Sequence, residues 1–134
     1  MKKSGTLNSQ LSRILAMMGH TDRIAICDCG LPIPHGAEVV DLALTKNIPR
    51  FIETVNVILE ELHVESAVIA SEMPKVSPRI HQELLRLLGG TPVTSVPHEE
   101  FKRQTASNGN ISFVRTGEAT PFANVILVAG VAFD

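Results

Sequence analysis

Apolar residues recur every three or four positions in three stretches of the chain, which is the spacing that places them on one face of a helix. Asn8 can cap the first of these helices and Gly19 can end it, while Pro49 suits the first turn of the second. The pattern predicts helices over residues 9–18, 49–62 and 77–88, and we expect a further short helix over residues 97–105.

Short runs rich in valine, isoleucine and alanine separate these helices. They predict strands over residues 23–28, 38–44, 65–71, 92–96, 111–116 and 124–131. Strands that alternate with helices favour an α/β fold with three layers and a largely parallel sheet. Residues 117–123 are too few for a helical crossover, so we expect the last two strands to form an antiparallel pair. The whole chain, residues 1–134, has the length of a single domain with a sizeable core.

Polar residues gather where the predicted strands meet one edge of this sheet. Asp28 ends the first strand, and Glu72 follows the third. His98 lies just past the fourth strand, and Asn124 begins the last one. Ligands of open α/β sheets bind outside the carboxyl ends of the strands. We therefore expect a ligand site at this edge, and we place His20 beside it, in the turn before the first strand.

His20 is the candidate for proton transfer. It follows Gly19 at the end of the first predicted helix, where the helix dipole favours a cation. An imidazole held there can stay protonated near neutral pH and act as a general acid. The alternative is a plain helix-terminal histidine that stabilises its helix by a few tenths of a kcal/mol.

The other candidates also have two interpretations each. Asp28 could bind a ligand or could cap the backbone of the turn at Gly30. His98 and Lys102 are four residues apart and share a helix face, so both could donate hydrogen bonds to hydroxyl groups, or both could belong to a solvated surface.

Aromatic and charged residues near the same edge add two expectations. Phe122 is the only aromatic residue near it, so any face on which a sugar stacks would come from this ring. Arg115 and Glu118 bracket a glycine and could form a structural ion pair.

Composition narrows the function classes. The formal net charge is −2, with 12 basic and 14 acidic residues and no basic stripe, which argues against nucleic-acid binding. No apolar run approaches the roughly 20 residues of a membrane span, and no secretory signal is evident, so we expect a cytosolic protein without a membrane partner. Cys27 and Cys29 are expected to be reduced thiols, and no paired metal-ligand motif or phosphate-binding loop occurs. We expect neither a metal nor another cofactor, and acid/base chemistry on a neutral, hydroxyl-rich molecule.

Four groups of short segments run through the chain in order. They cover residues 1–5 and 7–9, residues 18–22 and 28–34, residues 98–102, and residues 115–118 and 120–124. Together they resemble the D-ribose pyranase family, a branch of the bacterial sugar mutarotases. The Gly-His pair at 19–20 also resembles L-fucose mutarotases, whereas Gly-Leu-Pro-Ile-Pro at 30–34 and His-Glu-Glu-Phe-Lys at 98–102 resemble the ribose branch more closely.

The resemblance implies an enzyme that interconverts the β-pyranose and β-furanose forms of D-ribose. It implies these roles for single residues: His20 as proton donor, Asp28 and His98 as substrate ligands, and Phe122, Ala123 and Asn124 as the last binding stretch. The family commonly has tyrosine where this chain has Phe122, so stacking is expected there without the hydroxyl contact. It further implies pentameric rings stacked into homodecamers, with sites formed between neighbouring subunits.

Two other functions remain open from the sequence. One is a mutarotase for another sugar, such as L-fucose. The other is a non-catalytic sugar-binding module, which would use the same hydroxyl-binding edge.

Overall fold

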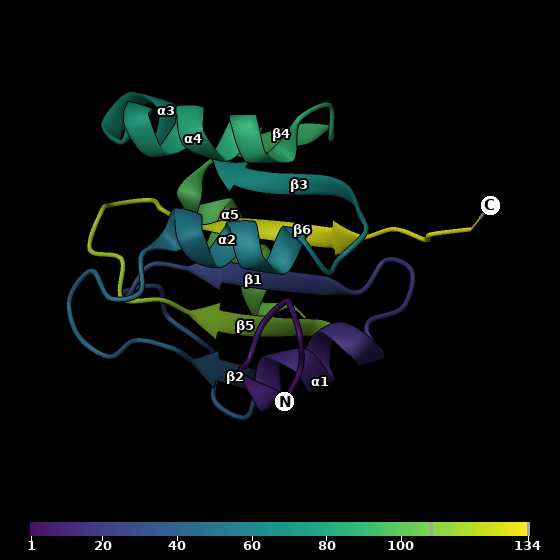
Figure 1. The fold of residues 1–134 in the computed structure, drawn as a ribbon. Coiled ribbons are helices and arrows are strands. Elements are labelled where there is room, and N and C mark those ends of the chain that lie inside the picture. Colours follow the sequence, from purple (N-terminus) through teal and green to yellow (C-terminus); the bar gives the residue numbers. More distant parts are fainter. Residues whose placement is uncertain (108, 134) are drawn as a thin grey trace.

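The computed structural model describes residues 1–107 and 109–133, and Figure 1 shows its arrangement. The helices are α1 Ser9–Met17, α2 Phe51–Leu59, α3 Met73–Val76, α4 Pro78–Leu88 and α5 His98–Ala106. The strands are β1 Arg23–Cys27, β2 Glu38–Asp41, β3 Val64–Ala70, β4 Val93–Val96, β5 Ile111–Arg115 and β6 Val125–Ala129. All predicted helices and strands are present, and the one-turn helix α3 is additional.

The six strands form one sheet in the order β2-β5-β1-β6-β3-β4. Three pairs are parallel, and β6 runs antiparallel to both of its neighbours, β1 and β3. The predicted α/β class with a largely parallel sheet and an antiparallel last strand is therefore confirmed.

The expected partner of the last strand was wrong, because β1 lies between β5 and β6. The segment after β5 does not turn back as a hairpin. It passes the end of β1, where the Cys29 N–H donates to the Glu118 carbonyl at 2.9 Å. Four of the five β6 residues are buried, and a strand this apolar gains more from two sheet neighbours than from an edge position.

Side chains alternate between two buried layers on either side of the sheet. Ile24 and Ile26 of β1 face the larger cluster, which also contains apolar residues of α1, α2 and α4. Ala25 and Cys27 face the other side, where Phe101 of α5 completes a smaller cluster. Helices thus cover both faces of the sheet, which confirms the three-layer prediction (Figure 1).

The starts of α1 and α2 show how well local sequence signals predict where a helix begins. The Asn8 side chain accepts a hydrogen bond from the Leu11 N–H and caps α1 as predicted. Pro49, expected in the first turn of α2, instead precedes the N-cap residue Arg50. A local and a distant carboxylate hold this start, since Glu53 accepts the N–H of Arg50 and Glu118 accepts the N–H of Phe51.

The strand directions give the sheet two opposite edges, which are defined by where the parallel strands end and begin. The parallel strands β1, β3, β4 and β5 end at one edge, where β6 begins; we call this the carboxyl edge. The same strands begin at the opposite edge, the amino edge, where β6 ends and the C-terminal tail leaves the sheet (Figure 1). Within the two described ranges, no helix has both the length and the apolar character needed to cross a membrane.

Candidate active site

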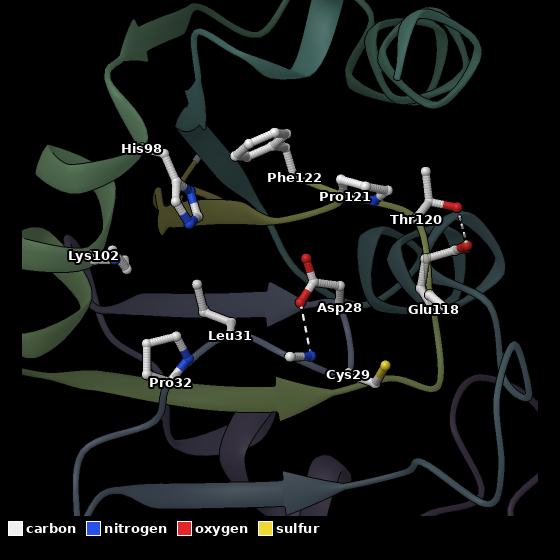
Figure 2. A pocket seen from close by; sticks show the side chains of 12 residues that line it. Asp28, Cys29, Leu31, Pro32, His98, Lys102, Glu118, Thr120, Pro121 and Phe122 are labelled. Carbon is white, nitrogen blue, oxygen red and sulfur yellow. Dashed lines mark hydrogen bonds between the residues drawn. The ribbon is translucent and has the colours of Figure 1, made fainter. Parts of the chain in front are cut away.

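A cavity of about 510 Å³ opens at the carboxyl edge of the sheet. Its wall brings together four of the residues predicted from sequence, which are Asp28, His98, Lys102 and Phe122. Figure 2 shows His98 and Phe122 on one side, Leu31 and Pro32 on the other, and the Asp28 carboxylate between them. The cavity thus combines hydrogen-bonding groups with an aromatic and aliphatic surface, as binding sites for small molecules do.

Asp28 is held rigidly where β1 ends. The Gly30 N–H donates to its Oδ1 at 2.9 Å, and the Asn124 amide donates to its Oδ2 at 3.1 Å. The Asp28 N–H in turn donates to Asn124 Oδ1 at 2.9 Å. The capping interpretation of Asp28 is confirmed by the bond from Gly30, and the same carboxylate lines the cavity, where ligand binding stays a prediction.

His98 is the first residue of α5, and its ring lies between two aromatic side chains. The Phe122 ring meets it edge-on at 5.0 Å between centroids, and the Phe101 ring is stacked at 6.3 Å. Its Nδ1 is buried and has no hydrogen-bond partner within the described residues.

Lys102 lies one helical turn after His98 and lines the same cavity, so the two share a face of α5 as predicted. Its Nζ is 2.8 Å from Glu99 Oε1. This ammonium holds the pKa of the Glu99 carboxyl below its usual value. Lys102 thus places a charged donor at the cavity rim.

Glu118 is fully buried beside the cavity, and its carboxylate accepts three hydrogen bonds. The donors are Arg50 Nη1 at 3.0 Å, the Phe51 N–H at 3.1 Å and Thr120 Oγ1 at 2.7 Å. A buried carboxylate needs such partners, and here they tie the cavity wall to the start of α2.

The expected ion pair between Arg115 and Glu118 is wrong. Arg115 ends β5 opposite Asp41 of the parallel strand β2, and its Nη1 lies 3.1 Å from both oxygens of that carboxylate. Pairing between strands, rather than proximity in sequence, decides the partner.

Residues 122–124, one stretch in sequence, divide into three roles. Phe122 faces the cavity with a left-handed backbone (φ 62°), a costly conformation for a bulky residue. Ser77 holds the preceding residue through a 2.6 Å hydrogen bond from its hydroxyl to the Pro121 carbonyl. Ala123 packs fully buried in the larger core cluster, and Asn124 is buried behind Asp28.

His20 is not beside this cavity, which corrects the placement expected from sequence. It precedes β1, so it lies at the amino edge, and the five residues of β1 span roughly 16 Å toward the other edge. The His20 Nε2 is 2.8 Å from Glu65 Oε2 at the start of β3. The error came from treating closeness to the first strand as closeness to the end of that strand.

Two loops contribute apolar and polar side chains to the cavity wall that the sequence analysis did not predict. These are Leu31 and Pro32 after β1 and Thr120 and Pro121 before β6. The signal was present, since prolines and glycines exclude regular structure at 30–36 and both segments flank strand ends at the carboxyl edge.

Comparison with known proteins places this geometry in a family. The model of the RbsD / FucU transport protein family matches residues 1–132. A D-ribose pyranase of Coprothermobacter proteolyticus is 55% identical over 133 residues, which cover 99% of this chain and 100% of that protein. A D-ribose pyranase of Vibrio vulnificus is 51% identical over 141 aligned positions, with the same coverage.

Solved structures agree. The structure of Bacillus subtilis RbsD complexed with D-ribose superposes with a TM-score of 0.93 and 44% identity, covering 99% of this chain and 100% of that one. A fucose mutarotase from Streptococcus pneumoniae, solved with L-fucose, shares the fold with a TM-score of 0.81 at 23% identity, covering 99% of this chain and 100% of that one. With a family model that spans nearly the whole chain and relatives that are half identical over their full lengths, this protein belongs to the RbsD/FucU family.

Proposed function

We propose that this protein is a D-ribose pyranase, an intramolecular isomerase that interconverts β-D-ribopyranose and β-D-ribofuranose. The observation that carries the proposal is the cavity of Asp28, His98, Lys102 and Phe122 in a chain whose full-length relatives are D-ribose pyranases. Its polar groups suit sugar hydroxyls, and the Phe122 ring suits the apolar face of a sugar.

Ring opening requires two proton movements. As the bond between C1 and the ring oxygen breaks, the ring oxygen gains a proton and the anomeric hydroxyl loses one. The open aldehyde rotates, and the O4 hydroxyl attacks C1 to close the five-membered ring, losing its proton while the aldehyde oxygen gains one. No electrons are exchanged, so the balance needs no redox cofactor. Positioned acid and base groups typically contribute about 10²- to 10⁴-fold to such a rate.

In this proposal His20 donates the proton to the ring oxygen. Asp28, or a water it holds, accepts the anomeric proton or orients the acid. Glu65 supports the assignment of His20, because its carboxylate is at hydrogen-bond distance from the imidazole and can fix the ring orientation.

The separation of His20 from the cavity implies that two copies of the chain build one site. His20 stands at the amino edge and Asp28 at the carboxyl edge, so the His20 of one chain can complete the cavity of the next. Such a head-to-tail contact forms a ring when the rotation between neighbouring copies closes on itself. We infer a homo-oligomer on this basis, and the pentameric rings and homodecamers of the family fit it.

Exposed apolar side chains at the amino edge favour that contact. Met17, next to the His20 turn, is 69% exposed, and Phe133 in the tail beyond β6 is 86% exposed. A lone chain would leave both in water, whereas a docked neighbour would bury them.

We place the enzyme in the cytosol, where ribose becomes available after uptake.

Saturation-transfer NMR on equilibrated sugar tests the function. Adding the protein to D-ribose should speed magnetisation transfer between the pyranose and furanose anomeric protons, and the effect on L-fucose should be smaller. Faster exchange on fucose than on ribose would identify a mutarotase of the other specificity. Ribose binding without faster exchange would identify a non-catalytic binding module.

The variant His20→Ala tests the proton donor. It should fold, because the side chain is 54% exposed and lies outside both core clusters. The exchange rate should fall about 10²-fold or more, the usual contribution of a positioned acid. His81→Ala, which removes a histidine from α4, is the matched control and should keep the wild-type rate. A His20→Ala protein that exchanges ribose at the wild-type rate would refute the assignment.

A further inference from the structure

The helix that carries His98 and Lys102 begins without a cap from its own sequence. Its N-cap residue is Pro97, and no side chain of the adjacent sequence accepts a hydrogen bond there. The first N–H groups of a helix need acceptors when they are shielded from water. The sequence around Pro97 therefore leaves the start of α5 dependent on another part of the fold.

Glu72 supplies the missing acceptor from 26 residues away. It lies two residues after the end of β3, at the carboxyl edge, and its two carboxylate oxygens lie 3.0 Å and 3.2 Å from the backbone nitrogen of His98. Ser71 donates its hydroxyl to the same carboxylate at 3.2 Å. A negative charge at the amino end of a helix is also favoured by the helix dipole.

The anchored residue is the one whose ring enters the cavity. His98 carries its backbone N–H to Glu72 and its imidazole into the sugar site, as Figure 2 shows for the ring. The imidazole edge that carries Nδ1 is buried and has no hydrogen-bond partner among the described residues, so a sugar hydroxyl in the cavity could bond to it. A shift of the helix start would move this edge directly, since His98 is the first residue of α5.

We propose that Glu72 is a positioning residue for sugar binding, which acts by fixing the start of α5 and thereby the His98 imidazole. Glu72 itself is not one of the residues that line the cavity. The inference rests on the proposed function, because it assigns the sugar contact to His98. Glu72 thus supports a cavity-lining residue from outside the cavity, a role that the positions of the strand ends alone do not reveal.

Three substitutions separate the hydrogen bond from the charge. Glu72→Ala removes the acceptor, and KM for ribose should rise about tenfold with kcat nearly unchanged, the pattern of an interaction made equally in ground and transition states. Glu72→Gln keeps a carbonyl oxygen at the same reach and should bind ribose within about threefold of wild type. Glu72→Asp withdraws the carboxylate by one methylene and should resemble Glu72→Ala.

A double-mutant cycle with His98 distinguishes positioning from general stabilisation. In a His98→Ala background, Glu72→Ala should raise KM no further, because the residue it positions is gone. Glu60→Ala, an exposed carboxylate at the end of α2, is the matched control and should leave KM unchanged. Additive effects of Glu72→Ala and His98→Ala would overturn the proposal, as would a wild-type KM in folded Glu72→Ala protein.

If Glu72→Ala does not fold, Glu72→Asp and Glu72→Gln test the positioning role of Glu72. Weak ribose binding by Glu72→Asp and near-normal binding by Glu72→Gln support the proposal, and equal binding by both contradicts it. Failure of the wild-type protein to exchange ribose would instead refute the proposed function. The two failures are therefore separate results.

Discussion

At the residue scale, buried side chains hold the side chains that line the cavity. Asp28 could be predicted as a site residue, because it ends an apolar strand and needs a partner. Its contact with Asn124 could not be predicted, since the two are 96 residues apart and meet only because β6 lies next to β1. The backbone of Phe122 is likewise a product of its loop, and no sequence period indicates a positive φ there.

Asn124→Asp tests the support of Asp28. The new carboxylate would still accept the Asp28 N–H, but its second oxygen would face the Asp28 carboxylate where an amide donor now lies at 3.1 Å. We expect the free energy of unfolding to fall by about 1–3 kcal/mol and ribose to bind at least about tenfold more weakly. Urea unfolding and calorimetric titration measure the two effects.

The control for this variant is Asn56→Asp on the exposed side of α2, which should change neither quantity. Normal ribose affinity in folded Asn124→Asp protein would show that Asp28 does not need its amide partner.

Cys27 makes the stability of the protein sensitive to alkaline pH. Burial, reinforced by the nearby Asp28 carboxylate, raises the pKa of its thiol from 9.0 to about 12. The unfolded chain therefore loses this proton near pH 9 while the folded chain retains it, so stability falls as pH rises from about 9 toward 12. Between pH 8 and pH 10.5 this group should remove about 2 kcal/mol from the free energy of unfolding.

Comparison with Cys27→Ala isolates the contribution of this thiol from other groups that titrate in the same range. At one fixed protein concentration, the wild type should lose about 2 kcal/mol more than the variant over this interval. Equal losses in both proteins would mean that the thiol is not protected by burial.

At the element scale, periodicity predicted where helices and strands lie but not how they meet. The helical spacing of apolar residues marks α2 and α4 because each buries one face against the sheet. The place of β6 between β1 and β3 was not available from the sequence, since loop length limits direction and says little about neighbours. The four-residue α3 has too few positions for any period to emerge.

Gly117 is the position where the loop before β6 touches the loop before α2 most closely. A Cβ there would lie 2.8 Å from the Ile48 carbonyl carbon and closer still to two backbone oxygens, and backbone cannot move aside as a flexible side chain can. Gly117→Ala should lower the melting temperature by several degrees, which corresponds to about 1–3 kcal/mol for overpacking. It should also weaken ribose binding, because the displaced loop carries the cavity wall at 118–122.

Gly90→Ala provides the matched comparison for this prediction. Nothing lies within 4 Å of its would-be Cβ, and its backbone is not left-handed, so its melting temperature should stay near that of the wild type. Equal melting temperatures for the two variants would contradict the close approach at Gly117.

At the scale of the whole molecule, the proposed proton donor and the proposed sugar ligands lie at opposite edges of one sheet. Sequence analysis named both sets of candidates, His20 from its helix end and Asp28 and His98 from strand ends. It did not separate them in space, although a turn that precedes a strand and a residue that ends the strand lie at opposite edges. The structure makes the separation plain, since His20 before β1 lies at the amino edge and Asp28 after β1 lies at the carboxyl edge.

The most direct test of the account mixes two impaired variants, at a ribose concentration below KM. His20→Ala lacks the acid at the amino edge, and His98→Ala lacks a sugar ligand at the carboxyl edge. Each alone should exchange ribose anomers slowly in saturation-transfer NMR. After the two are unfolded together and reassembled in equal amounts, about one site in four should receive both intact residues, so about a quarter of the wild-type rate should return. A mixture no faster than its parents would contradict a ribose site shared between neighbouring chains.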